Sequence, residues 1–219
     1  MPVKRPTNNK SISYAITVHN EDDSLSLLLE RIYEYIRPPD EVVIVDDYSD
    51  NPNTVAILLK QKKVYQHKLN RNYAAQKNYL NSKCKNEYIF QLDADELPTR
   101  KLMENIPKLI ARNPTIDLFW IPRQNYYVGM TQEHTQRWRW IPDDQNRINY
   151  PDNQGRLYKN KEMIRWSRRL HERIMGCKLY TIIPKNSGLD IIHKNSVEKQ
   201  VRSNLNYIKY FSNDEVKGK

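Results

Sequence analysis

Three short apolar runs in the first half of the chain each end in polar or acidic residues, and this pattern constrains the fold most. The runs are residues 12–18 (ISYAITV), 41–45 (EVVIV) and 88–92 (YIFQL), and they are followed by HNE, DDYSD and DADE. Short runs rich in β-branched side chains are typical of strands that are buried on both faces. We therefore expect parallel strands whose carboxyl ends meet at one sheet edge, where such sheets bind ligands.

Helical segments are expected between and after these runs. The first has its apolar residues at helical spacing and ends at Pro38 and Pro39, because proline cannot continue a helix. Further helices are expected around 54–61, at 72–83 and near 102–110, with a short strand at 64–69. The alternation of strand and helix predicts an α/β fold with a mostly parallel central sheet and helices on both faces.

The second half of the chain is less regular. We expect a strand at 117–122, short strands at 156–158 and 178–183, and a polar, loop-like, Trp-rich segment at 132–153. A closing helix should follow Ser196 and bury one apolar face, which consists of Val197, Val201, Leu205, Ile208 and Phe211. The sequence contains no internal repeat and no low-complexity linker, which favours one domain over residues 1–219.

Composition narrows the class of protein. Fifteen Tyr and four Trp argue against a disordered chain. No apolar stretch approaches the roughly 20 residues of a membrane span, and the first residues, MPVKRPTNNKS, have no apolar core of a secretory signal. The two cysteines, Cys84 and Cys177, form no metal-binding pair, which suits a reducing compartment. These features predict a cytoplasmic protein and leave contact with a membrane surface open.

The charge balance favours a polyanionic partner. The net charge is +10, and Lys and Arg are dense between residues 156 and 178, where only Glu162 and Glu172 oppose them. Nucleic acid, an anionic membrane surface and a phosphorylated glycan all fit such a balance. A lysine-rich, merely soluble surface is the simpler alternative.

The acidic strand ends predict a metal-assisted phosphate site. Carboxylates gathered at one sheet edge repel each other unless a cation lies among them. Hard oxygen ligands suit Mg²⁺ or Mn²⁺, which bind one or two protein carboxylates together with phosphate oxygens. The chain has only five glycines and neither GxGxxG nor GxxxxGK[ST], so a backbone cradle for phosphate is not expected. Asp93 and Asp95 form a DxD pair directly after an apolar strand.

Longer stretches carry a family resemblance. They are ITVHNE, EVVIVDDYSD, NRNYAAQKN, YIFQLDADELP, IPRQNY, NYPDNQGRLYKN, RWSRRLHERI and LDIIH, in this order between residues 12 and 193. The chain resembles an inverting family-2 glycosyltransferase with the GT-A fold, and within that family the branch of lipopolysaccharide-core glucosyltransferases. The resemblance implies one Rossmann-like domain, with a nucleotide-sugar-binding half at 11–98 and an acceptor-side half with the closing helix at 99–219.

The resemblance also implies donor-site residues. In the first loop, Thr17, His19 and Glu21 meet the nucleotide. Asp46 and Asp47 follow the second strand, where a carboxylate reads the base. Lys77 and Asn78 belong to the segment NYAAQKN, which lines the donor cleft. Two departures stand out: Tyr48 is present where glycine is common, and RWSRRL replaces a glycine-rich acceptor segment.

The resemblance implies a metal site as well. Asp95 corresponds to a direct ligand of Mn²⁺ or Mg²⁺, and Asp93 is a further candidate ligand that lies nearer the ribose. His193 corresponds to a histidine that completes the metal or diphosphate site. A hydrogen-bonded histidine at a strand end is the alternative for His193. Arg123 and Arg156 are candidates for holding the diphosphate, because bidentate arginine suits phosphate; both could equally be surface arginines.

Inverting transfer needs a base that deprotonates the acceptor hydroxyl. The resemblance places Glu172 in that role, and His171 is the second candidate because its ordinary pKa also suits proton transfer. A structural ion pair with the neighbouring arginines is the alternative for Glu172.

The expected function is metal-dependent transfer of a sugar, most simply from a UDP-sugar, to a hydroxyl of a glycan or lipopolysaccharide-type acceptor. Hydroxymethylated bases of DNA are an alternative acceptor, since the segments RWRW and RWSRR could follow a phosphate backbone. Trp138, Trp140 and Trp166 are candidates for stacking on a sugar or a base, and core packing is the simpler fate of Trp166. A non-catalytic, basic nucleic-acid-binding module is the alternative from another class.

Overall fold

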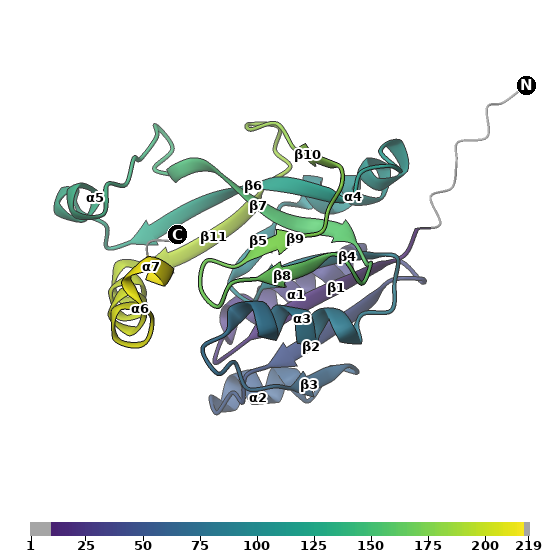
Figure 1. Ribbon diagram of the computed structural model, residues 1–219, viewed down its shortest axis with the longest axis horizontal. Helices are drawn as coiled ribbons and strands as arrows, with labels where there is room; N and C mark the ends of the chain where they lie inside the picture. The colour runs from purple at the N-terminus through teal and green to yellow at the C-terminus, as the bar shows by residue number, and fades with distance from the viewer. Residues whose placement is uncertain (1–9, 217–219) are drawn as a thin grey trace, which may run out of the picture.

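The first half of the chain folds as its alternating pattern predicts (Figure 1). The computed structural model describes residues 10–216. Its first elements are β1 (Ile12–Val18), α1 (Asp23–Tyr35), β2 (Glu41–Asp46), α2 (Pro52–Leu58), β3 (Val64–Gln66), α3 (Tyr73–Lys83) and β4 (Tyr88–Asp93). β1 lies between β2 and β4 and is parallel to both, and β3 lies parallel to β2 at the sheet edge.

Helices cover both faces of this sheet. α1 and α4 (Arg100–Arg112) bury their apolar residues on the face that carries Tyr14, Ile16 and Phe90. α3 covers the opposite face, where Val43 and Val45 lie. Side chains alternate between the faces of a strand, so a run that is apolar at every position is buried from both sides.

The second half extends the sheet with strands of both directions. The additional strands are β5 (Glu96–Pro98), β6 (Leu118–Val128), β7 (Ile148–Lys159), β10 (Tyr180–Ile182) and β11 (Ile191–Ser196). The sheet order is β3-β2-β1-β4-β7-β6-β11-β5, and β10 pairs with β6. β7 is antiparallel to both β4 and β6. β8 (Arg165–Ser167) and β9 (Arg173–Met175) form a separate hairpin that packs with α3. The predicted fold class, one α/β domain with a mostly parallel sheet, is confirmed.

Two sequence predictions for this half are wrong. Residues 132–153 are not a loop, because they contain α5 (Gln132–Trp138) and the start of β7. The expected strand at 117–122 continues to Val128, since β7 pairs with one side of it and β11 with the other. Pairing with distant strands overrides the polar local sequence, as is common in sheets.

The closing helix forms, but its orientation was predicted wrongly. It is α6 (Val197–Tyr210), followed by the short α7 (Asn213–Val216). Val197 is buried, whereas the side chains of Leu205 and Ile208 are 62% and 69% exposed. The helix lies beside β11 at one end of the molecule (Figure 1), and its polar face turns inward. Among residues 10–216, no helix combines the length and the apolar character that a membrane crossing requires.

Candidate active site

A cleft of about 440 Å³ opens at the carboxyl ends of β1 and β4, between α3, the β8–β9 turn, β11 and α6. It brings together most of the residues predicted to form the site. They are Thr17, His19, Glu21, Asp47, Lys77, Asp93, Asp95, Arg123, His171, Glu172 and His193. The cleft therefore lies where parallel α/β sheets bind their ligands.

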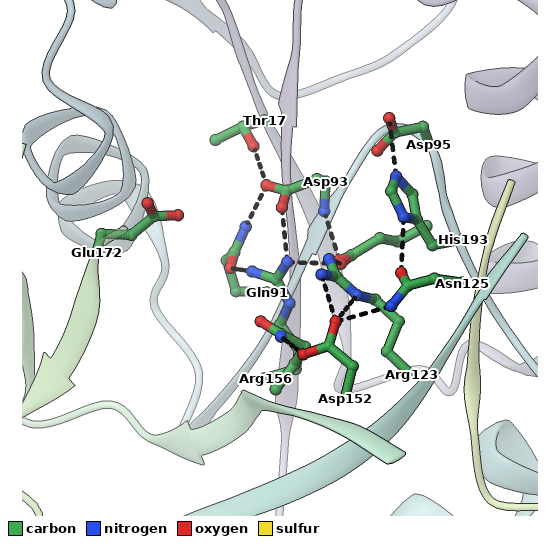
Figure 2. Close-up of polar contacts among 12 residues, drawn as sticks. Thr17, Gln91, Asp93, Asp95, Arg123, Asn125, Asp152, Arg156, Glu172 and His193 are labelled. Carbon is green, nitrogen blue, oxygen red and sulfur yellow. Dashed lines mark hydrogen bonds and ion pairs between the residues drawn. The ribbon is translucent and has the colours of Figure 1, made fainter. Parts of the chain in front are cut away.

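Asp93 is the most tightly held carboxylate of the cleft (Figure 2). Its Oδ1 accepts hydrogen bonds from Thr17 Oγ1 at 2.8 Å and Gln91 Nε2 at 3.2 Å, and its Oδ2 accepts from Arg156 Nη2 at 2.6 Å. Burial alone would raise the pKa of Asp93, but Arg156 and Lys77 outweigh burial and hold that pKa well below its ordinary value. Asp93 is thus a fixed anion whose two oxygens already have protein partners.

Arg156 does not face the cleft. Its side chain is 3% exposed, and its Nη2 lies 2.6 Å from both Asp93 Oδ2 and Glu96 Oε1. Its Nη1 also donates to Gln91 Oε1 at 2.6 Å. The structure therefore corrects the prediction that Arg156 holds a diphosphate, because its guanidinium neutralises buried carboxylates instead.

Arg123 reaches the cleft but is also committed to carboxylates. Its Nη1 donates to Glu96 Oε1 at 2.8 Å, and its Nη2 donates to Asp152 Oδ2 at 2.6 Å. Burial would raise the pKa of Asp152, and the nearby Arg123 lowers it below its ordinary value. The guanidinium of Arg123 thus already donates to two carboxylates, and its role with the diphosphate stays a prediction.

Asp152 also orients His193 through Asn125. Asn125 Nδ2 donates to Asp152 Oδ2 at 2.9 Å, so its Oδ1 faces His193 Nδ1 at 2.9 Å. In this arrangement Nδ1–H of His193 donates to Asn125, and Nε2 points toward Asp95 Oδ2 at 3.5 Å (Figure 2). A polar group that fixes the ring and the tautomer of a histidine is the usual support of a metal ligand.

Asp95 and His193 fit a hard divalent cation. Two ligand atoms bound to one such ion at about 2.1 Å are separated by roughly 3.0 to 3.4 Å, close to the observed spacing of the pair. Burial would raise the pKa of Asp95, but His193 and Lys199 lower it to about 2, so the carboxylate is ionised. Among residues 10–216, no three His, Cys, Asp or Glu side chains form a complete metal site. A Mg²⁺ or Mn²⁺ ion held here would take its other ligands from a diphosphate and water.

Asp93 was predicted as a further metal ligand, and the structure argues against that role. Both of its oxygens accept hydrogen bonds from the protein, and it faces Thr17 and Arg156 rather than His193. The two aspartates of the DxD pair point in different directions because β4 ends at Asp93. Asp95 lies beyond the strand.

Lys199 was missed by the sequence analysis. Its ammonium contacts Glu21 and lies 3.2 Å from Asp95 Oδ2. Burial would lower the pKa of Lys199, but Asp95 and Glu21 outweigh it and raise that pKa. Ser203 and Tyr207 line the cleft from the same face of α6. The available signal was the interval of four residues from Lys199 to Ser203 and from Ser203 to Tyr207, and the apolar stripe of the same helix obscured it.

Glu172 lies on the opposite wall of the cleft (Figure 2). Lys77 Nζ donates to Glu172 Oε1 at 2.5 Å and lies 3.6 Å from Asp93 Oδ1. Burial would raise the pKa of Glu172, but Lys77 outweighs burial and lowers it. The neighbouring arginines, which were the expected ion-pair partners, are exposed on the β8–β9 hairpin. His171 is exposed, and its Nε2 lies 2.9 Å from the carbonyl oxygen of Val216.

Two other predicted donor-site residues lie outside the cleft. Asp46 is buried and accepts hydrogen bonds from Ser49 N at 3.0 Å and Ser49 Oγ at 2.6 Å, which holds the turn after β2. Asn78 makes two hydrogen bonds of 2.8 Å with the backbone of Trp166 and so anchors β8 to α3. Both predictions are corrected, because these side chains serve the scaffold. Trp166 is buried, as expected.

The residues predicted to meet the nucleotide lie together. His19 Nδ1 is 2.8 Å from the carbonyl oxygen of Asp47, and Asp47 Oδ1 accepts from Leu69 N at 2.8 Å. Tyr48, which stands where the family commonly has glycine, adopts a left-handed φ of 51°. The turn thus keeps the backbone conformation that favours glycine.

The sequence matches the family model described as Glycosyl transferase family 2 over residues 13–187. The chain belongs to this family. The prediction of a family-2 glycosyltransferase is therefore confirmed, while the lipopolysaccharide-core branch stays a prediction.

Solved structures have a similar fold. The fragment 1–349 of TarS from S. aureus matches with a TM-score of 0.60 and 15% identity, over 84% of this chain and 60% of that chain. The same fragment in complex with UDP matches with a TM-score of 0.60 and 16% identity, over 89% and 63% of the two chains. This chain thus spans roughly three-fifths of the TarS fragment.

Mannosyltransferase PcManGT from Pyrobaculum calidifontis, in complex with GDP-Man and Mn²⁺, matches with a TM-score of 0.45 and 24% identity, over 52% of this chain and 35% of that chain.

Proposed function

We propose that this chain transfers a sugar, with inversion, from a nucleoside diphosphate-sugar to a hydroxyl of a glycan acceptor, and that the reaction needs Mn²⁺ or Mg²⁺. The observation that carries the proposal is the opposed arrangement of the cleft. Asp95, His193 and Lys199 form one wall, and Glu172 with Lys77 forms the other. A sugar between them would have its leaving group on one side and its attacking hydroxyl on the other.

The donor would bind along the ends of β1 and β4. His19 and Asp47 lie where the nucleotide is expected, and Asp93 is held rigid beside Thr17. UDP-sugars are the first candidates, since TarS of similar fold has been solved with UDP-GlcNAc and with UDP. GDP-sugars belong in the same test.

The leaving group needs positive charge as its bond to the sugar breaks. A divalent cation held by Asp95 and His193 would supply a Lewis acid at the diphosphate. Lys199 adds an ammonium on the same wall. Its side chain is 44% exposed and would turn from Glu21 toward a phosphate oxygen of the donor. Its raised pKa keeps it charged throughout the neutral range.

Glu172 is the proposed base. Its lowered pKa leaves it ionised at neutral pH and able to accept a proton. As the acceptor oxygen attacks C1, its proton passes to Glu172, the bond from C1 to the phosphate oxygen breaks, and the nucleoside diphosphate leaves with the electron pair. Lys77 orients the carboxylate during this step. His171, the second candidate, is exposed and its Nε2 lies 2.9 Å from the carbonyl oxygen of Val216, whereas Lys77 holds Glu172, so the geometry favours Glu172.

The hairpin that brings Glu172 to the cleft favours a negatively charged acceptor. Its strands β8 and β9 carry the exposed Arg165 and Arg173. A phosphorylated glycan that extends along this hairpin would be attracted to them.

We keep the cytoplasm as the proposed location.

The test is thermal unfolding of the purified chain with UDP-, GDP-, CMP- and dTDP-sugars, each with Mn²⁺, with Mg²⁺ and with EDTA. A donor at 100 times its dissociation constant stabilises a protein by about 2.7 kcal/mol, which raises the melting temperature by a few degrees. We expect one nucleotide class to give this rise with metal and to lose it with EDTA. Absence of any metal-dependent rise, together with salt-sensitive DNA binding, would contradict the proposal and favour the nucleic-acid-binding module.

A further inference from the structure

A row of aromatic rings extends from the cleft along the segment between β6 and β7. Tyr127 lines the cleft and lies edge-on to His193. Its ring centroid is 4.1 Å from that of Trp140, which is 4.7 Å from that of Trp138. His134 continues the row at 5.2 Å from Trp138. These four side chains, Tyr127, Trp140, Trp138 and His134, are called the aromatic row below.

Core packing does not account for the row. α5 carries His134 and Trp138 but buries none of its residues, and the side chain of Ile141 just beyond it is 73% exposed. Trp138 and Trp140 are each half-buried, and their neighbours Arg137 and Arg139 are exposed. Large aromatic side chains held at the surface of a short helix expose apolar area to water without serving the core.

The backbone is shaped to bring the rings together. Thr131 and His134 form a capping box at the start of α5, and Trp140 N donates to the carbonyl oxygen of Thr135. Arg139 has a φ of 55°. This left-handed residue is the C-cap of α5, a common way for a helix to end, and it turns the chain so that the rings on either side of it meet.

We propose that the aromatic row binds the acceptor, with sugar rings of an oligosaccharide stacked on Trp138 and Trp140 and its terminal hydroxyl directed past Tyr127 into the cleft. The inference rests on the proposed transfer, because it identifies the acceptor of the same site. The faces of aromatic rings carry negative charge density, and the C–H faces of sugar rings are apolar and weakly positive, so the two stack.

The geometry favours sugars over nucleobases. The rings of Tyr127 and Trp140 are tilted by 38°, and those of Trp140 and Trp138 by 50°. Neighbouring rings touch each other, which leaves no parallel slot into which a flat base could insert. A bent, faceted surface suits the thicker, non-planar rings of an oligosaccharide, with the exposed arginines available to its hydroxyls or phosphates.

The experiment measures retention on an array of neutral and phosphorylated di- to tetrasaccharides, with the single-stranded oligonucleotide (dT)12 as a further probe. The proteins are the wild type, Trp138→Ala, Trp138→Phe and Tyr180→Ala. Tyr180 is the matched control, because it is a 63% exposed aromatic residue on β10, which pairs with the opposite end of β6. The donor-induced melting shift of each variant is measured in parallel.

We expect Trp138→Ala to weaken glycan retention by about tenfold, the factor that corresponds to roughly 1.4 kcal/mol, with Trp138→Phe retaining most of it and Tyr180→Ala unchanged. The donor shift should be equal in all four proteins. Three results would overturn the inference: no glycan retained by the wild type, equal loss in Tyr180→Ala, or Trp138-dependent retention of (dT)12 in place of glycans. A wild type that retains glycans but shows no donor shift would contradict the proposed transfer instead.

Discussion

Lys77 Nζ lies 2.5 Å from Glu172 Oε1, and this ion pair joins the two halves of the chain at the cleft. The lysine comes from α3 and the glutamate from the turn between β8 and β9. The lysine also lies 3.6 Å from Asp93, so one buried ammonium serves the proposed base and the end of β4.

Replacing the proposed base should abolish transfer and leave donor binding intact. Glu172→Gln keeps the shape of the side chain but cannot accept a proton, so we expect transfer to fall by about 10²- to 10⁴-fold. The donor-induced melting shift should not change. Glu162→Gln, an exposed glutamate before β8, is the control and should keep full activity. Retained transfer in Glu172→Gln would point to His171.

Removing the lysine should shift the pH profile toward higher pH. Lys77 lowers the pKa of Glu172, so Lys77→Gln should raise that pKa. The base must be ionised to act, and the acid limb of kcat/KM therefore moves to higher pH in the variant. The measurement is kcat/KM against pH for both proteins. An unchanged acid limb with reduced kcat would mean that Lys77 only supports the fold of the cleft.

Metal dependence should be lost at Asp95. In Asp95→Asn a neutral amide replaces the carboxylate that faces His193. We therefore expect the Mn²⁺-dependent part of the donor shift, up to about 2.7 kcal/mol at saturating donor, to disappear. Asp144→Asn, an exposed aspartate outside the cleft, is the control. A full Mn²⁺-dependent shift in Asp95→Asn would exclude the assigned metal site.

Arg156 should matter for stability more than for binding. Arg156→Met leaves Asp93 and Glu96 without their shared cation in a buried setting. Breaking one side of a buried ion pair costs about 3 to 5 kcal/mol of unfolding free energy. Urea denaturation measures the loss, and Arg165→Met on the exposed face of β8 should change stability by less than about 0.5 kcal/mol. A small effect in Arg156→Met would show that water or a rearranged side chain replaces the guanidinium.

The exposed stripe of α6 should tolerate polar residues. Leu205→Gln should change the unfolding free energy by less than about 0.5 kcal/mol, because the side chain already contacts water. Leu28→Ala on α1 removes a fully buried side chain and should cost about 2 to 5 kcal/mol. Denaturation curves of both variants measure these changes in unfolding free energy. A large loss in Leu205→Gln would mean that the apolar stripe is covered in solution.

The sequence was sufficient where a local pattern specifies a local structure. The apolar runs became β1, β2 and β4, and the amphipathic segment after the first run became α1. Consecutive residues are enough to predict burial on both faces of a strand or on one stripe of a helix. The acidic ends of those strands were expected at one edge, and Asp47, Asp93 and Asp95 do line one cleft.

Local patterns could not assign partners to these side chains. Asp93 pairs with Arg156 on β7, and Asp95 lies beside His193 on β11 and Lys199 on α6, all of them far along the chain. Asp93 is a fixed anion and Asp95 faces the proposed cation because different groups from these distant segments lie beside the two carboxylates.

The sequence by itself determined the family, the α/β core and the position of the acidic strand ends. Only the tertiary structure decided that β7 runs antiparallel through the sheet, that the polar face of α6 turns inward, and that Lys77 reaches Glu172. The physical reason is that periodicity encodes which face of an element prefers to be buried, whereas the partner of each charged group depends on contacts between distant segments.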